Sequence, residues 1–326
     1  MMKQPISGIH HVTAIASDPQ RNLDFYTQVL GLRLVKRTVN FDDPGTYHFY
    51  FADEVGSPGT ILTFFPWPGA ARGRIGVGQA TVTSFAVPEH SLNYWEDRLV
   101  GAGVPVEKSG KRLGEELLTI ADPDGLKVEL IASSWAKPSH AWAGSFTPPE
   151  HAVYGFHSVT LSEQGYERTA KTLGTMGFRK VSEEGNRFRF EVGDGGAGAR
   201  VDVLCASEAP QGRIGAGTVH HVAWRVADDA SQKSWRTHLA ENDFDVTPVM
   251  DRCYFHSIYF REPGGVLFEL ATDPPGFAID EPVDTLGEGL KLPVWLERYR
   301  NDIEKALPRI ELHKPRKDDS LGKSAS

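Results

Sequence analysis

The alternation of hydrophobic and polar residues predicts that the chain opens with a strand, a helix and three further strands. Residues 8–17 alternate as a half-buried strand does. Asp18 and Pro19 then supply an N-cap and a first-turn residue, and apolar residues recur at helical spacing until Gly31, which ends the helix. Strand-like runs follow at 32–39, 46–52 and 60–65. This order predicts one βαβββ module.

The same order of elements recurs three more times along the chain. The later modules open with strands predicted at 81–87, 156–161 and 219–226. The segments GRIGVGQATVTSF (73–85) and GRIGAGTVHHVAW (212–224) lead into the second and fourth modules with nearly the same residues. Both run into strands rather than helices, which favours turns over a phosphate-binding loop. We predict an α+β fold, in which four βαβββ modules form two domains of cupped mixed β-sheet with helices outside.

The repeats also predict the domain boundaries. Modules one and two form a first half over 1–133, and modules three and four form a second half over 153–277. A proline-bearing linker joins them over 134–152. An extension over 278–310 follows, with a helix predicted from Pro293 to Leu307 by apolar residues at helical spacing, and the tail at 311–326 is predicted to be disordered.

Residues able to bind a metal ion survive in only some of the modules. Aligning the first strands places Thr81, Ser158 and His221 at the position of His11, and aligning the last strands gives the set Thr63, Glu129, Val203 and Glu269. If modules one and four face each other, His11, His221 and Glu269 come together beside Thr63. Modules two and three would offer one carboxylate among hydroxyl and apolar groups. We therefore predict one metal site and one site that has lost its ligands, with Glu129 as a structural residue.

Two neutral imidazoles and one carboxylate on one face of an ion leave coordination positions open. Non-heme Fe(II) enzymes use this set to bind both substrate and O₂. A single strand histidine is more often a packing or solvent-facing residue. However, two HHV strand openings at equivalent places, together with a glutamate inside the apolar strand GVLFELA, favour the metal site.

Several stretches resemble the vicinal oxygen chelate superfamily, the fold of glyoxalase I, fosfomycin-resistance proteins and extradiol dioxygenases. They are GIHHVTAIASDPQRNLDFYTQVLGLRLVKRTVNFDDP, GSPGTILTFFPW, GTVHHVAW and MDRCYFHSIYFREPGGVLFELATDPPGF. Within the superfamily, the sequence over 7–277 is most similar to the ring-cleaving hydroquinone dioxygenases. The resemblance implies that His11, His221 and Glu269 bind Fe(II), with Mn(II) as the alternative ion. It also implies that further residues surround the ion, namely Thr13, His10, His220, Arg252 and Tyr259.

Each of these five residues also has a structural interpretation. Thr13 lies two residues from His11 and so shares its strand face, but threonine is also a good strand residue. Tyr259 could reach a reacting oxygen or simply pack. Arg252 could orient an anionic substrate or form a surface ion pair. Alternation directs His10 and His220 away from the ligands, unless a local bulge brings them back.

The predicted activity is Fe(II)-dependent cleavage of a dihydroxylated aromatic ring by O₂, with hydroquinone preferred over catechol on the resemblance. Two alternatives stay open: a glyoxalase-like metal-dependent isomerase or transferase, and a protein that binds an aromatic compound without chemistry. Isomerases of this fold usually supply four protein ligands, so Thr63 at the fourth position argues against that alternative.

Composition restricts the partners and the compartment. The 326 residues are 40% hydrophobic and carry a net charge of −8, which argues against nucleic acid as a partner. No apolar run is long enough to span a membrane, and the N-terminus lacks a signal-peptide layout. Two isolated cysteines, Cys205 and Cys253, fit a reducing cytoplasm. We expect a cytoplasmic enzyme whose partners are a small aromatic diol and O₂; a homo-oligomer is compatible with the sequence.

Overall fold

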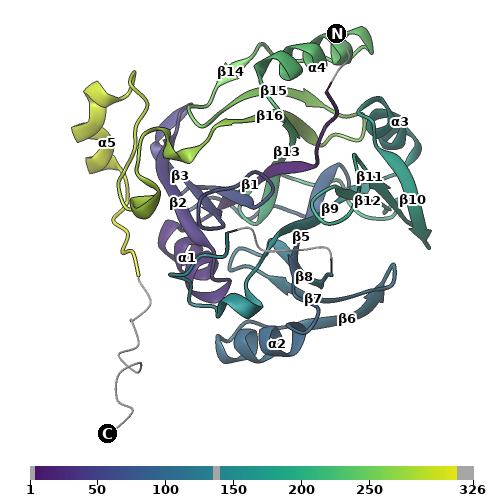
Figure 1. The fold of residues 1–326 in the computed structure, drawn as a ribbon, viewed down its shortest axis with the longest axis horizontal. Helices are drawn as coiled ribbons and strands as arrows, with labels where there is room; N and C mark the ends of the chain where they lie inside the picture. Colours follow the sequence, from purple (N-terminus) through teal and green to yellow (C-terminus); the bar gives the residue numbers. More distant parts are fainter. Residues whose placement is uncertain (1–3, 135–139, 314–326) are drawn as a thin grey trace, which may run out of the picture.

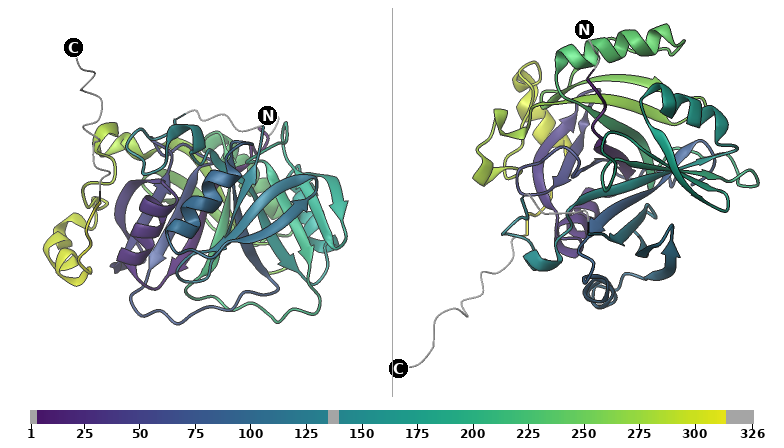
Figure 2. Two further views of the ribbon diagram at one scale, coloured as in Figure 1. Left: turned by 90° about the horizontal axis from the view of Figure 1, so that it is seen from below. Right: turned by 45° about the vertical axis from the view of Figure 1, so that its right-hand side comes forward.

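The computed structural model describes residues 4–134 and 140–313, whose strands form two curled, mixed sheets (Figures 1 and 2). The first, here the 1/4 sheet, has the order β14-β15-β16-β13-β1-β4-β3-β2. Its strands are β1 (Ile9–Ala16), β2 (Arg33–Asn40), β3 (Asp43–Ala52), β4 (Ile61–Pro66), β13 (Thr218–Val226), β14 (Met250–Asp251), β15 (Phe255–Arg261) and β16 (Leu267–Pro275). They all come from modules one and four, so the predicted pairing of these modules is confirmed.

The second sheet, here the 2/3 sheet, has the order β10-β11-β12-β9-β5-β8-β7-β6. Its strands are β5 (Gln79–Val87), β6 (Glu107–Arg112), β7 (Glu115–Ala121), β8 (Lys127–Ala132), β9 (Gly155–Glu163), β10 (Arg179–Glu184), β11 (Arg187–Glu191) and β12 (Arg200–Cys205). The predicted α+β fold of four modules is confirmed. Each sheet takes one module from each half of the sequence, and the domain boundaries at 133/134 and 152/153 stay a prediction.

One helix of each module lies on the outside of its sheet (Figure 1). These helices are α1 (Pro19–Asp24), which continues into the π-helical turn η1 (Phe25–Val29), α2 (Leu92–Gly101), α3 (Glu167–Thr175) and α4 (Asp229–Glu241). The Asp18 side chain accepts a hydrogen bond from the Arg21 backbone N–H at 2.8 Å, which confirms the predicted N-cap. Trp95, Leu173 and Trp235 are buried beneath their helices, and burial of each such side chain contributes about 1.5–3 kcal/mol.

The chain after module four differs from the prediction. The helix expected from Pro293 to Leu307 is wrong in its first half, because only η5 (Glu297–Tyr299) and α5 (Arg300–Ala306) are helical. Trp295 is 48% exposed, so the apolar stripe packs only through its later residues. Earlier turns are η3 (Phe277–Ile279) and η4 (Val283–Thr285), and η2 (Pro149–His151) lies in the predicted linker.

The extension lies beside β2 and β3 at one edge of the molecule (Figure 1). Lys36, on β2, is fully buried and forms ion pairs with Asp280 at 2.6 Å and Glu281 at 2.9 Å. These contacts attach the extension to the 1/4 sheet. Of the tail predicted to be disordered, residues 314–326 lie outside the described residues, as do 135–139 of the predicted linker. Among the helices of the described residues, none has the length and apolar character needed to cross a membrane.

Candidate metal centre

His11, His221 and Glu269 meet at the centre of the 1/4 sheet. β1 and β13 run antiparallel with Thr13 opposite His221, and β16 lies on the other side of β13. The Nε2 atoms of His11 and His221 are 3.3 Å apart. Glu269 Oε2 is 3.3 Å from the first and 2.9 Å from the second. All three side chains are buried, so residues 258 positions apart along the chain form one group that could hold a metal ion.

These distances match the geometry of a facial metal site. Two atoms bound at about 2.1 Å to one ion and at a right angle lie about 3.0 Å apart. The three separations, from 2.9 to 3.3 Å, bracket that value. Glu269 Oε2, which faces both imidazoles, is buried and lacks a hydrogen-bond donor among the described residues. A divalent cation fits this arrangement because it would satisfy all three atoms at once.

The charge state of Glu269 also suits a cation. Burial acts to raise the pKa of its carboxyl, but His11 and His221 outweigh burial and hold the pKa well below its usual value. The second oxygen, Oε1, accepts a hydrogen bond from Ser257 Oγ at 2.5 Å. Burial lowers the pKa of His221. The centre therefore combines a carboxylate whose orientation is fixed with imidazole that burial keeps neutral.

His10 and His220 lie directly behind the two candidate ligands. The Nδ1 atoms of His10 and His11 are 2.9 Å apart, and those of His220 and His221 are 2.8 Å apart. If Nε2 of each ligand binds an ion, its Nδ1 carries the proton and donates it to the neighbouring histidine. Burial lowers the pKa of His10, and it lowers that of His220 to about 3, so both are neutral acceptors.

Two β-bulges produce this arrangement. The β1–β13 pairing shifts between Ile9 and His11, and again between Thr13 and Ala14. The first shift leaves His10 unpaired and the second does the same for His220. A bulge re-aims a side chain that regular alternation would direct elsewhere, which explains why these histidines reach the ligands.

A cavity of about 340 Å³ opens at the centre. His11, His221, Thr13, Tyr259, Arg252 and His220 line it together with Asn40, Phe41, Asp42, His48, Tyr50, Phe65, Trp67, Phe255 and Leu267. Four of the five residues predicted to surround the ion therefore lie in its wall with the two candidate ligand histidines, whereas His10 stays behind His11. Aromatic rings and polar side chains share this wall, a combination suited to a small aromatic compound that carries polar groups.

Arg252 and Tyr259 form one polar side of this cavity. Arg252 Nε donates a hydrogen bond to the Tyr259 hydroxyl at 3.3 Å, and Arg252 Nη1 lies 3.5 Å from Asp42. Burial, followed by the charge of Glu269, raises the pKa of Tyr259 well above its usual value. The phenol is therefore protonated at neutral pH and able to donate a hydrogen bond.

Two cavity residues, His48 and Tyr50, carried no motif that would have identified them from sequence, and Thr63, which was predicted at the fourth position, lies behind them. Thr63 takes the fourth position, opposite Thr13 in the β1–β4 pairing. His48 and Tyr50 lie on the neighbouring strand β3. Their only sequence signal was a histidine and a tyrosine alternating in TYHFYF, a pattern that ordinary strands share.

The equivalent place in the 2/3 sheet contains ion pairs instead of ligands. Glu129 lies opposite Ser84 in the β5–β8 strand pairing, as Glu269 lies opposite Ala223 in the β13–β16 pairing. Both Glu129 oxygens accept hydrogen bonds from Arg112 at 2.6 Å, and Ser84 Oγ donates to one of them at 2.7 Å. The prediction that Glu129 is a structural residue agrees with this arrangement.

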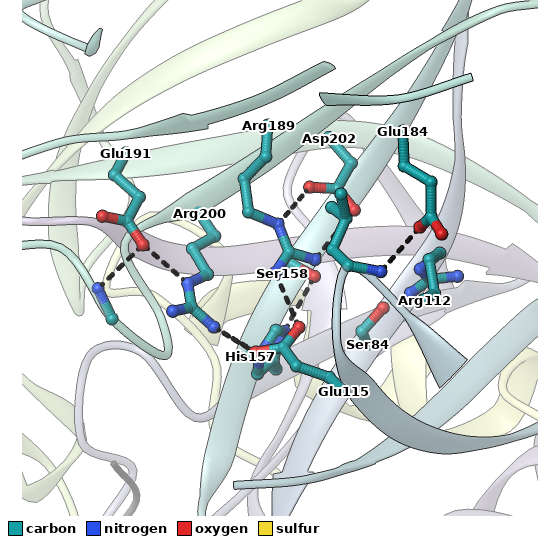
Figure 3. Close-up of polar contacts among 12 residues, drawn as sticks. Ser84, Arg112, Glu115, His157, Ser158, Glu184, Arg189, Glu191, Arg200 and Asp202 are labelled. Atoms are coloured by element: carbon teal, nitrogen blue, oxygen red, sulfur yellow. Dashed lines mark hydrogen bonds and ion pairs between the residues drawn. The ribbon is translucent and has the colours of Figure 1, made fainter. Parts of the chain in front are cut away.

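Further ion pairs fill the rest of this sheet's centre (Figure 3). Arg189 lies between Asp202 and Glu115, and Arg200 bridges Glu115 and Glu191. His157 contacts Ser158 Oγ at 3.0 Å, as His10 contacts His11. Arg187 also contacts Asp202, at 3.2 Å, so the basic side chains of this cluster already hold the nearby carboxylates.

One predicted equivalence is wrong. His221 pairs with Thr13, and the matching pair in the 2/3 sheet is Val82 with Thr160. Val82, not Thr81, therefore corresponds to His221. Thr81 corresponds to His220 instead, because a bulge leaves both unpaired, and Thr81 contacts Ser162. The repeated segments GRIGVGQATVTSF and GRIGAGTVHHVAW agree, since they align Val82 with His221. The apolar Val82 makes the loss of ligands at this second place more complete than predicted.

Comparison with known proteins places the chain in a family. The family model described as "Glyoxalase/Bleomycin resistance protein/Dioxygenase superfamily" matches residues 8–130. A Bacillus subtilis relative named "Putative ring-cleaving dioxygenase MhqO" is 48% identical over 95% of this chain and 99% of its own length. The chlorohydroquinone/hydroquinone 1,2-dioxygenase of Sphingobium indicum is 33% identical over 93% of this chain and 97% of its own.

Solved structures agree with this placement. The crystal structure of a "putative dioxygenase" from Bacillus subtilis superposes with a TM-score of 0.92 at 47% identity, covering 96% of this chain and all of that one. Glyoxalase I from Zea mays, at 15% identity, superposes with a TM-score of 0.60 over 82% of this chain and 92% of that one, which shows a shared fold alone. The chain belongs to the Glyoxalase/Bleomycin resistance protein/Dioxygenase superfamily, in the group that contains these ring-cleaving dioxygenases.

Proposed function

We propose that this member of the superfamily is a ring-cleaving dioxygenase that opens a dihydroxylated aromatic ring with O₂, using one Fe(II) ion bound by His11, His221 and Glu269. The observation that carries the proposal is the convergence of two buried imidazole Nε2 atoms and one buried carboxylate oxygen beside an aromatic cavity. Mn(II) is the alternative ion, because the same three ligands suit it. The names of the relatives support the reaction class.

The choice of substrate follows from the relatives and the cavity. Hydroquinone is preferred over catechol because the Sphingobium indicum relative is named for hydroquinones. A cavity of about 340 Å³ is of a size for one substituted ring, and Phe41, Phe65 and Phe255 offer it apolar surfaces. Arg252 supplies positive charge at the cavity wall, which favours a phenolate over a phenol.

A bound Fe(II) ion would supply the open coordination positions and the one-electron chemistry that bring a phenolate and O₂ together. The protein's own groups would do the remaining work. His10 and His220 accept the Nδ1 protons of His11 and His221 and so orient both rings. The aromatic wall excludes water, and the protonated Tyr259 donates a hydrogen bond or a proton to a reacting oxygen, with Arg252 holding its hydroxyl in place.

The isomerase alternative is disfavoured by the fourth position. Thr63 has no ionisable group, and its hydroxyl is already engaged with Thr13 and His48, each at 2.9 Å. A transferase, or a binding protein without chemistry, would not consume O₂. The two cysteines are both free, in keeping with the cytoplasm that we propose as the compartment.

Oxygen uptake tests this function. Protein loaded with Fe(II) under anaerobic conditions is mixed with aerated hydroquinone, and catechol is tested in parallel. We expect oxygen consumption with a ring-opened product, faster with hydroquinone than with catechol. Binding of either diol without any oxygen consumption by the iron-loaded protein would contradict the proposal and favour the non-catalytic alternative.

A further inference from the structure

A continuous chain of hydrogen bonds crosses three strands beside the candidate centre. Thr13 and Thr63 hydroxyls are 2.9 Å apart, Thr63 Oγ1 is 2.9 Å from His48 Nε2, and His48 Nδ1 is 2.9 Å from the Tyr50 hydroxyl. The four side chains come from the adjacent strands β1, β4 and β3. Thr13 and Thr63 are fully buried and Tyr50 is 1% exposed, whereas His48 is partly exposed where it lines the cavity.

Thr63 stands where a ligand carboxylate stands in module four. It pairs with Thr13 on β1 as Glu269 pairs with Ala223 on β13, and Thr13 and Ala223 each follow a candidate ligand by two residues. A threonine hydroxyl is a weak ligand for a divalent ion, and here it both receives and gives a hydrogen bond. At this fourth position, Thr63 therefore links Thr13, which lines the cavity, to His48.

The series of hydrogen bonds has two possible states, which differ in the direction of every hydrogen bond. Burial, followed by the nearby His11 and His221, lowers the pKa of His48 well below its usual value, so its imidazole is neutral and carries one proton. Four groups then contribute four protons to three hydrogen bonds. If Tyr50 donates to Nδ1, the imidazole donates to Thr63 and Thr63 to Thr13, whose own proton is left over. If every bond reverses, Tyr50 has the spare proton.

Both ends of this series of hydrogen bonds, Thr13 and Tyr50, reach the same cavity. Thr13 and Tyr50 line it, together with His48, while Thr63 lies behind them. Tyr50 shares this cavity wall with Arg252 and Tyr259. Switching between the two states therefore moves one proton from one part of the cavity wall to another.

We propose that His48 is a proton relay that works by exchanging its two neutral tautomers, carrying a proton from the Thr13 end of the cavity to the Tyr50 end. A substrate hydroxyl gives its proton to Thr13 Oγ1, and Thr13 passes its own to Thr63, Thr63 to His48 Nε2 and His48 Nδ1–H to Tyr50. Tyr50 then releases its proton to an oxygen of the opened ring. Each group ends neutral and no electron moves along the chain.

The relay rests on the proposed function and suits its balance of atoms. A diol and O₂ together contain every atom of the neutral ring-opened product, so a proton removed from the substrate hydroxyl can be returned to an oxygen of the opened ring. The hydrogen-bonded route from Thr13 to Tyr50 offers a path for that return. His48, which acts through Thr63 and Tyr50, is on this account a positioning and relay residue, and Thr63 is its indispensable link.

Substitutions at Thr63 test the relay. Thr63→Val keeps the shape of the side chain and breaks the link between His48 and Thr13, whereas Thr63→Ser keeps the hydroxyl. Thr38→Val is the matched control: Thr38 pairs with His48 on β2, is fully buried and has a hydroxyl without a hydrogen-bond partner among the described residues. We expect Thr63→Val to lower kcat by roughly 10–100-fold with unchanged iron content and unchanged hydroquinone affinity. Thr63→Ser should recover most of kcat, and Thr38→Val should match the wild type.

A second readout is independent of turnover. Two-bond ¹H–¹⁵N spectra of the metal-free, histidine-labelled protein, with His48→Gln to assign the ring, report which nitrogen carries the proton. The wild type should show a neutral His48 ring with one protonated nitrogen at pH 7, and Thr63→Val should shift its tautomer populations because Nε2 loses its partner. Equal kcat in Thr63→Val and Thr38→Val, or a doubly protonated His48 ring at pH 7, would overturn the relay. If the wild type consumes no oxygen, the proposed function fails, whereas a doubly protonated His48 ring counts against the relay alone.

Discussion

The hydroxyl of Tyr259 is held at the cavity wall by contacts on both sides of the strand. Its backbone pairs with Glu269 across β15 and β16, and its backbone N–H donates to Thr247. Arg252 contacts the hydroxyl itself. The phenol is therefore fixed in place and protonated, as a proton donor needs to be.

Replacing Tyr259 by phenylalanine separates catalysis from packing. A lost proton donor should lower oxygen uptake by roughly 10²–10⁴-fold with iron content unchanged, because Tyr259 is not a ligand. Tyr47→Phe is the control, since the Tyr47 hydroxyl donates to the Pro308 carbonyl and lies outside the cavity wall. It should cost about 0.5–1.5 kcal/mol of stability and leave uptake intact. Wild-type uptake in Tyr259→Phe would return this residue to a packing role.

At the scale of the strands, the bulges in β1 and β13 set the surroundings of both candidate ligands. The convergence of His11, His221 and Glu269 could be predicted from sequence because they occupy equivalent places in repeated modules. The orientation of His10 and His220 could not, because alternation assumes an uninterrupted period of two and a bulge leaves no distinctive residue pattern.

Because the bulge in β1 places His10 beside His11, removing the His10 ring should weaken iron binding. His10→Ala removes the acceptor of the His11 Nδ1 proton, so iron affinity should fall by roughly 10–100-fold, measured by competition with a chelator. His157→Ala is the matched control in the equivalent bulge of the 2/3 sheet, where it contacts Ser158, Glu115 and Arg200. It should leave iron affinity unchanged. Equal iron affinity in the two variants would mean that His10 does not support His11.

The extension shows where periodicity fails as a guide. Trp295, Tyr299, Ile303 and Leu307 recur at helical spacing, but only Ile303 and Leu307 are buried. The earlier pair has no sheet surface beneath it, so the regular helix begins only at Arg300. Tertiary contacts, which sequence spacing does not contain, decided this boundary, whereas helices of the modules that do cover a sheet were predicted correctly.

Across the whole molecule, the two sheets have the same arrangement of modules, but the 1/4 sheet holds the candidate metal ligands and the 2/3 sheet holds ion pairs. In the 2/3 sheet, Arg112 occupies the place of a cation beside Glu129, whose side chain is 4% exposed. Arg112→Ala would leave a buried carboxylate unpaired and should cost about 3–5 kcal/mol, measured by urea unfolding. The double variant Arg112→Met with Glu129→Leu should recover most of that loss. An Arg112→Ala protein as stable as the wild type would contradict this account of the ion pair.

A buried pair of acidic residues, one from each sheet, makes the stability of the fold depend on pH. Glu163, at the end of β9, lies near Glu262, which follows β15. Burial, then Glu262, raises the pKa of Glu163 to about 8. Because the folded pKa is raised, this group's contribution to stability is complete below the unfolded pKa of 4.5 and is lost as pH rises through about 8. Glu163→Gln should therefore raise the thermal midpoint relative to wild type at pH 9 more than at pH 5. An equal difference at both pH values would refute the shift.

If modules one and four form a single iron site, elemental analysis of purified, Fe(II)-loaded protein should find one iron per chain in the wild type. Glu129→Gln should keep that full iron, because Arg112 already neutralises Glu129. Glu269→Ala should lose it, because one of the three converging ligand atoms is gone. Full iron occupancy in Glu269→Ala, or loss of iron in Glu129→Gln with the fold intact, would contradict the account.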